Sequence, residues 1–496
     1  MMPDLFSQPS RLVLACLLFT TPSAALFAQD DFEAYKKQMT QGSQQVKSEF
    51  REYKEKQDRE FADFLKQRWS EFETFKGVVR IKEPKPKQVP SAPAPKITPE
   101  PAPVVVAPIL APVTPPPPPA QPKPAPVAAD ELELAFYGNT VRFAFDPQWK
   151  TYRLSSGAKP ETISDFWTMM SGSKYEAILQ AVNASRRELK LDDWGYVSLW
   201  RDVVRALQPD RRSEQNLLLW FFLTKSGCDV RLGYSGPDVH LFVAIKQPVY
   251  STQFTKVGSQ TYYAALDADH GKSIRSFYTY ESSYPIKLIP LDIKSASTGF
   301  SKTVPAQRKL AFAYRGKTIS FSVPYDRRLI EYMSGFPQSE FELYFDTEGS
   351  SLVRQGLLTE LKKHTVTMSE EEAVNFLLSF VQKAFSYKTD DDQFGYEKYF
   401  FVEESLHYPY NDCEDRSVIF AWLVHELVGI KTIGLLYPNH MTTAVELKQM
   451  SGNFTSVTHQ GKRYVIADPT YIGASVGMPM PSYAKLNPNR VVEIQH

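Results

Sequence analysis

The chain repeats part of its own sequence, and this repeat limits the folds open to its C-terminal part. The stretch 134–143 matches the stretch 312–321, 178 positions further on. At the same offset Leu199 falls on Leu377, in two segments whose apolar residues recur with a helical period. Similarity at a fixed offset indicates a duplicated structural unit.

A second group of matches follows at an offset of about 202. The matched pairs are Trp220 with Trp422, His240 with His440, and Asp267 with Asp468. The order of features is the same in both stretches. We therefore expect an α+β protein with two tandem domains, at residues 131–300 and 305–496.

The increase in offset from 178 to 202 indicates about 24 extra residues in the second copy. The insertion contains the segment Tyr387–Asp412, and Cys413 follows at once. The first copy passes from Leu207 to its matching helix without a cysteine. The second copy is therefore expected to be catalytic and the first to be degenerate.

Cys413 stands at the start of a predicted helix. Acidic residues flank it, the run Val418–Val428 is apolar, and Gly429 ends the run. The free amides and the dipole of a helix N-terminus favour a thiolate, the nucleophilic form of cysteine. The neighbouring carboxylates oppose this effect, so a positive group must offset them.

His440 and Asp468 are the expected partners of that thiol. His440 follows a predicted strand and turn, and Asp468 ends the predicted strand 464–467. A histidine can take the thiol proton, and a carboxylate can orient the imidazole. Cys413, His440 and Asp468 thus form the predicted catalytic triad.

Plainer interpretations of these residues are open. Cys413 could be a buried structural thiol, or it could form a disulfide with Cys228. The acidic residues that flank Cys413 argue against a buried structural thiol. The disulfide would join the end of one helix to the start of another in a different domain. In the first copy, His240 and Asp267 are expected to be ordinary hydrogen-bonding residues.

The region around the triad resembles the transglutaminase-like superfamily, over roughly residues 375–475. The matching motifs are Asp412-Cys413-Glu414-Asp415, the strand at His440, and Ala467-Asp468-Pro469-Thr470. The segment 392–399 is similar to one that bacterial transglutaminase-like cysteine proteinases carry before their cysteine. Many members place an aromatic residue shortly after the histidine, where this chain has the segment 441–444, so the acceptor preference is not set by the resemblance.

The resemblance implies a papain-like arrangement in which the thiolate attacks an amide and forms an acyl-enzyme. The oxyanion would be held by the amide of Cys413 and by a side chain from the segment 396–410, for which Tyr408 and Tyr410 are the candidates. No cofactor is implied as a requirement.

In some bacterial relatives the carboxylates beside the cysteine bind calcium. The matching positions are Asp412, Glu414 and Asp415, with Asp390–Asp392 as possible helpers, and oxygen ligands suit that ion. The alternative is that these acids only complement the helix N-terminus.

Residues 1–28 are typical of a secretory signal peptide. Arg11 precedes an apolar run over residues 12–19, and small residues at 23–28 offer a cleavage site. The run is too short to span a bilayer. We expect an exported, periplasmic or cell-surface protein without a transmembrane segment after processing.

Residues 30–80 carry an aromatic repeat with a period of 11 residues, at Phe50, Phe61 and Phe72. This period keeps one stripe on one face of a long helix, so the segment is predicted to be a helix or coiled coil. The stripe over 31–76 would serve self-association or a partner protein. A solvated stalk helix is the alternative.

Residues 83–128 are dominated by proline and predict a linker, either a stiff polyproline spacer or a disordered segment of no set length. The chain has 57 basic and 56 acidic residues, a net charge of +1. This balance gives no general attraction to nucleic acid.

These features together favour an exported cysteine protease or amidase that acts on a protein or peptide. A protein-glutamine acyltransferase that crosslinks proteins is the second hypothesis. A non-catalytic binding or scaffold protein is the third.

Overall fold

The computed structural model describes residues 45, 46, 48–67, 69–77, 85, 87–92, 130–266, 274–281, 284–449, 452 and 454–495. The chain divides after Phe61 into two units, which are described separately. The predicted signal peptide, most of the linker 83–128 and Asp267 lie outside the described residues. Within the described ranges, no helix is long and apolar enough to cross a bilayer.

The 11-residue repeat does not form one continuous helix. Residues 48–65 are helical, and Phe50 and Tyr53 are exposed. The third repeat instead lies in strand β1 (Trp69–Glu73), where the Phe72 ring stacks on Phe277 of strand β8 (Ser276–Tyr280). The predicted helix over 30–80 is thus corrected to one that ends at residue 65, because pairing with a distant strand overrides the local pattern.

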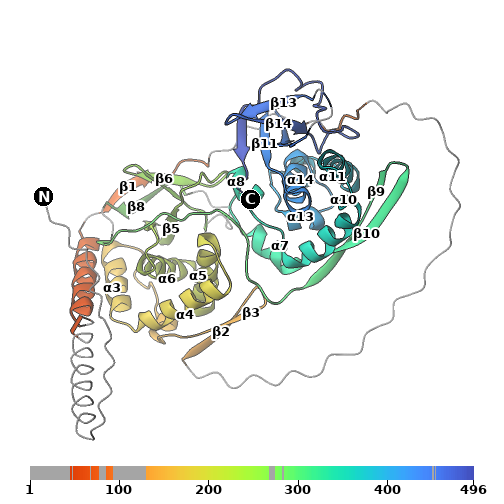
Figure 1. Ribbon diagram of the computed structural model, residues 1–496. Coiled ribbons are helices and arrows are strands. Elements are labelled where there is room, and N and C mark those ends of the chain that lie inside the picture. Colours follow the sequence, from red (N-terminus) through yellow and green to blue (C-terminus); the bar gives the residue numbers. More distant parts are fainter. Residues whose placement is uncertain are drawn as a thin grey trace, which may run out of the picture. The chain divides into compact units, whose positions relative to one another are not determined.

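The described residues from 69 onward fold as mixed α+β, in agreement with the predicted class. The described residues between 130 and 281 form a hairpin, five helices and five strands (Figure 1). They are β2 (Glu131–Phe136), β3 (Asn139–Ala144), α2 (Gln148–Thr151), α3 (Pro160–Ser171), α4 (Tyr175–Glu188), α5 (Asp193–Leu207), α6 (Arg212–Lys225), β4 (Val230–Ser235), β5 (Asp238–Ala244), β6 (Phe254–Val257), β7 (Gln260–Tyr263) and β8.

The elements from residue 305 onward follow the same general order, with more short helices. They are β9 (Pro305–Tyr314), β10 (Lys317–Asp326), α7 (Arg327–Ser334), α8 (Phe341–Phe345), α9 (Ser351–Val353), the π-helical turn η2 (Arg354–Leu358), α10 (Thr359–Thr365), α11 (Glu370–Ala384), α12 (Asp390–Gln393), α13 (Val402–His407), α14 (Cys413–Val428), β11 (Thr432–Tyr437), β12 (His440–Val445), β13 (Ser456–His459), β14 (Lys462–Ala467) and β15 (Arg490–Glu493).

The two larger sheets share one strand order. The first runs β1-β8-β4-β5-β7-β6, and the second runs β15-β11-β12-β14-β13 when read in the same direction. Without β1 at its edge, the first sheet has its five strands in the same spatial and chain order as the second. All the strand pairs are antiparallel.

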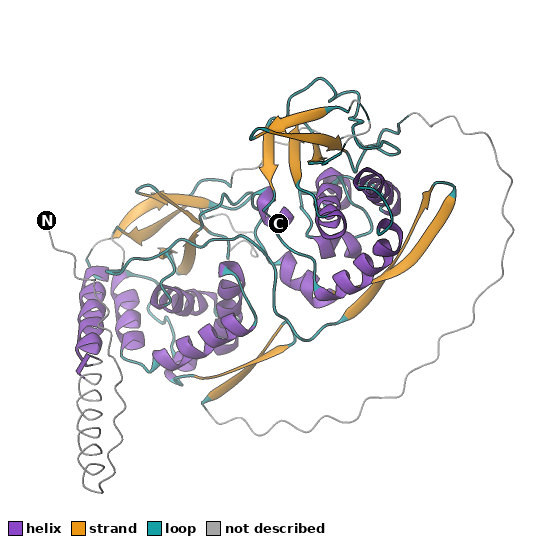
Figure 2. Cartoon of the chain, viewed as in Figure 1, coloured by secondary structure: helices purple, strands orange, loops and turns teal. Residues whose placement is uncertain are grey.

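The helices that precede each sheet also correspond. Helix α6 packs on β4 and β5, and helix α14 packs on β11 and β12 (Figure 2). Trp220 of α6 and Trp422 of α14 are both fully buried, as their matching positions predict. The hairpin turns hold glycines with positive φ at matching places, Gly138 at 79° and Gly316 at 75°, a conformation that disfavours other residues.

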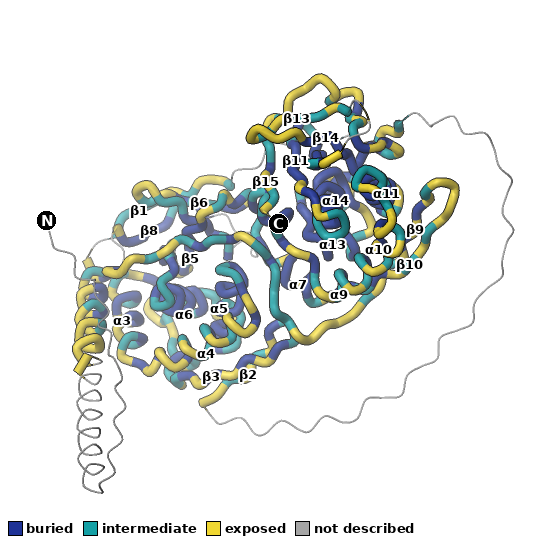
Figure 3. Tube along the Cα trace, in the orientation of Figure 1, coloured by how far each residue is buried: buried dark blue, intermediate teal, exposed yellow. Residues whose placement is uncertain are grey.

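Helix α14 is largely buried, including its whole first half (Figure 3). It packs against α11, α13 and the sheet. Gly429 ends it in the left-handed conformation at φ 71°. The position of Cys413 is therefore fixed by the packing of the surrounding elements.

Helices α5 and α7 bring the two halves of this unit together. The Trp194 indole donates to the Gly335 carbonyl at 2.8 Å, and a methyl group at Gly195 would collide with the Tyr332 hydroxyl. Asp192 caps α5 by accepting from the Gly195 amide at 2.7 Å. Burial raises the pKa of the Asp192 carboxyl to about 7, although that amide opposes the shift.

We predict that Asp192→Asn raises the free energy of unfolding at pH 8 but not at pH 4. The native state holds the Asp192 proton up to about pH 7, whereas the unfolded state loses it near pH 4. The contribution of Asp192 to the free energy of unfolding therefore falls as the pH rises from about 4 to about 7. The gain at pH 8 is about 4 kcal/mol, since asparagine keeps the cap without a buried charge. Urea unfolding of both proteins at pH 4 and at pH 8 measures this gain. An equal effect of the substitution at the two pH values would contradict the prediction.

Candidate active site

The nucleophile candidate lies at the first position of α14. The Cys413 side chain is buried, its Sγ donates to Glu414 Oε2 at 3.0 Å, and the Met441 amide donates to the sulfur at 3.5 Å. Burial and the Glu414 charge raise the pKa of the thiol well above its ordinary value. In this arrangement the thiol is neutral.

His440 and Asp468 form the second part of the site. His440 is the first residue of β12, and its Nε2 lies 3.0 Å from Asp468 Oδ2. The other oxygen of Asp468 accepts from the amides of Thr470 and Tyr471 at 2.9 and 3.2 Å. These two amides orient the carboxylate, and the carboxylate fixes the imidazole with Nε2 as the donor.

Cys413 and His440 line one cavity of about 290 Å³. The residues around it are Lys85, Phe341, Glu397, Tyr399, Cys413, Glu414, Leu436, Tyr437, Pro438, Asn439, His440, Met441 and Asn489. The structure thus brings the three predicted triad residues together, with Asp468 behind the histidine.

Tyr408 and Tyr410, the predicted oxyanion residues, do not line this cavity. The Tyr408 ring stacks on Phe400 at 4.8 Å between centroids, and Tyr410 is opposite Ser386 in a β-bridge. Tyr399 lines the cavity instead. No pattern in the sequence distinguishes Tyr399 from the neighbouring aromatic residues.

Tyr483 is a further site residue that the sequence does not reveal. Its ring stacks on the His440 imidazole with centroids 4.9 Å apart and planes at 20°. Its hydroxyl donates to Asn439 Oδ1 at 2.5 Å. Tyr483 therefore holds the histidine from the face of its ring, while Asp468 holds it from the edge.

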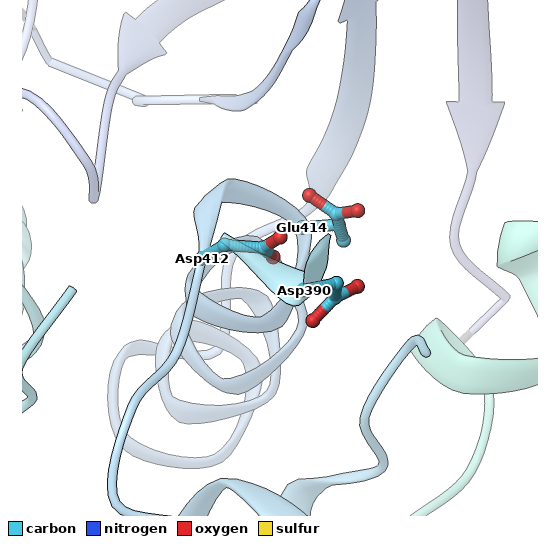
Figure 4. Close-up of side chains that lie close together, drawn as sticks. All are labelled: Asp390, Asp412 and Glu414. Atoms are coloured by element: carbon cyan, nitrogen blue, oxygen red, sulfur yellow. The ribbon is translucent and has the colours of Figure 1, made fainter. Parts of the chain in front are cut away.

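Three carboxylates gather beside the first turn of α14. Asp390, Asp412 and Glu414 each offer an oxygen within 4.8 Å of the others, and all three are buried (Figure 4). Burial and the Glu414 charge raise the pKa of Asp412, whereas burial is outweighed at Glu414 by the Lys85 ammonium, which lowers its pKa to about 2. Lys85 therefore favours the ionised form of Glu414, and the charge of Glu414 disfavours the ionised form of Asp412.

Asp415, the third predicted calcium ligand, has a different role. Its two oxygens accept from the amides of Phe400 at 3.0 Å and Asp412 at 3.1 Å. These bonds tie the inserted segment to the start of α14. The third member of the carboxylate cluster, beside Asp412 and Glu414, is therefore Asp390 and not Asp415.

The two other residues of interest lie away from this chemistry. Cys228 is free and buried, and burial raises its pKa to about 12. No disulfide joins it to Cys413. His240 lies in the first sheet with its Nε2 at 2.8 Å from Ser235 Oγ.

Comparison of the chain with family models, with curated proteins and with solved structures finds no match. The chemistry must therefore be inferred from the residues of the site. A thiol, an oriented imidazole and a carboxylate around one cavity are the parts needed for nucleophilic attack on a carbonyl carbon.

We predict that Tyr483→Ala slows alkylation of Cys413 by iodoacetamide about 3- to 10-fold, because a ring contact of this kind contributes roughly 0.5–1.5 kcal/mol. Tyr483→Phe keeps the stacked ring and should retain most of the rate. Mass spectrometry of the Cys413 peptide measures both. Equal rates in wild type and Tyr483→Ala would show that the ring does not position His440.

Proposed function

We infer that the second half of the chain is a transglutaminase-like cysteine hydrolase, a protease or amidase that acts on peptide amides. The observation that carries this proposal is the Asp468-held His440, which shares a cavity with Cys413 at a helix N-terminus. The first half is a degenerate copy of the same domain. The shared strand order and the matched helices support that part.

The proposed reaction begins when the thiol proton passes to Nδ1 of His440 and the sulfur attacks the amide carbon. The tetrahedral oxyanion then collapses, the carbon–nitrogen bond breaks, and His440 gives the proton to the leaving amine. A water molecule hydrolyses the thioester with the histidine as base. Asp468 stabilises the imidazolium and is not itself protonated.

The first copy lacks the nucleophile at the matching place. Helix α6 begins with Arg212, whereas α14 begins with Cys413. The Arg212 guanidinium donates to the Leu266 carbonyl. A guanidinium cannot attack a carbonyl carbon, which favours a binding or scaffolding role for this half.

A hard cation such as calcium would be held by Asp390, Asp412 and Glu414, whose buried oxygens fit it. It would supply positive charge beside the thiol. The proposed reaction does not require it, and the structure places the Lys85 ammonium at the same carboxylates.

The test is incubation of the full chain with a proteome-derived peptide library, with Cys413→Ser as the control. The proposal predicts new peptide N-termini that appear with the wild type and not with the variant. A labelled primary amine is included. Incorporation of the amine without new N-termini would favour the acyltransferase hypothesis. If neither new N-termini nor incorporated amine were detected, the binding-protein hypothesis would be favoured.

A further inference from the structure

The cavity beside Cys413 contains a side chain from a distant part of the sequence. Lys85 belongs to the proline-rich segment, yet its Nζ lies 2.7 Å from Asp412 Oδ2 and 3.0 Å from Glu397 Oε1 and also contacts Glu414. Only 11% of this side chain is exposed. A surface lysine would lose hydration here, so the carboxylates must compensate for that loss.

The lysine is held as a cation. Its ammonium group is paired with the carboxylates of Asp412, Glu397 and Glu414. A protonated amine has no lone pair with which to attack a thioester. Lys85 therefore occupies the site as a ligand and not as an amine acceptor.

A second contact holds the same segment further along. Ser91 bridges to Ile472 in parallel, with the Ala92 amide donating to the Ile472 carbonyl at 2.8 Å and the Ile472 amide donating to the Pro90 carbonyl at 3.2 Å. Ile472 lies four positions after Asp468. Backbone pairing plus one side chain in a pocket is how extended peptides bind protein surfaces.

The side chain of Ala92 completes this contact. It packs against a buried cluster of Tyr471, Ala474 and Met480, and Tyr483 lies against the same cluster. Because Tyr483 also stacks on His440, the bound segment and the triad share a supporting residue.

We propose that the carboxylate pocket beside Cys413 is a subsite for the lysine side chain of an extended peptide. In this chain the segment acts as an intramolecular ligand: Lys85 occupies the pocket in the cavity that Cys413 also lines, and residues 90–92 pair with Ile472. The proposal builds on the proposed function, because it names the class of peptide that this site accepts. A tethered ligand is present at an effective concentration in the millimolar range, so a peptide from another protein must displace it.

The test measures binding of a fluorescent peptide with the sequence of residues 83–93 to the full chain by fluorescence anisotropy, in chelator so that no metal competes. All proteins carry Cys413→Ser. Lys85→Ala and Lys85→Met are compared with Lys87→Ala, a matched control because Lys87 is 80% exposed and pairs only at the surface with Asp392.

The expected result is that both Lys85 variants bind the peptide at least tenfold more tightly than the parent and Lys87→Ala do. A peptide with norleucine at the first lysine should lose that binding. Equal binding by all four proteins, or undiminished binding of the norleucine peptide, would overturn the proposal. Because nothing is turned over, a chain that binds the peptide but cleaves no library peptide would contradict only the proposed function.

Discussion

The matching of buried charges at the start of α14 is the constraint on which the site depends. An ionised group buried without a partner costs several kcal/mol, so each of these side chains needs a specific contact. Asp415 accepts hydrogen bonds from two backbone amides, and Arg416 donates to the Phe385 carbonyl at 2.6 Å. Glu414 forms an ion pair with the Lys85 ammonium. These partners come from the inserted segment, the end of α11 and the proline-rich segment. The same contacts that satisfy the charges therefore fix Cys413 in its cavity.

The location of Cys413, His440 and Asp468 at one site could be predicted from sequence because each residue has a local signal. Cys413 begins a helix, His440 begins a strand, and Asp468 directly follows one. Tyr483 and Lys85 have no such signal, since each reaches the site only through tertiary contacts with residues far along the chain. The same reason explains why the sequence could not choose Tyr399 over Tyr408 or Asp390 over Asp415.

The fold, like the site, could be predicted from sequence only where a local signal marks the element. The internal repeat anticipates the matched elements, because buried tryptophans and turn glycines are set by local geometry as well as by packing. It does not anticipate β1, whose register with β8 depends on residues about 200 positions away. A helical period in a charged segment says nothing about a strand partner at that separation. The aromatic repeat therefore could not predict where helix 48–65 ends.

The most direct measurement is the rate at which iodoacetamide alkylates Cys413 at pH 7 in wild type, His440→Ala and Asp468→Asn. Cys228 in the same molecule is the internal control, because it is buried with a pKa raised to about 12. We expect Cys413 to react faster than Cys228 and to lose at least tenfold in rate when His440 is removed. A Cys413 rate that equals the Cys228 rate and does not change in either variant would contradict this expectation.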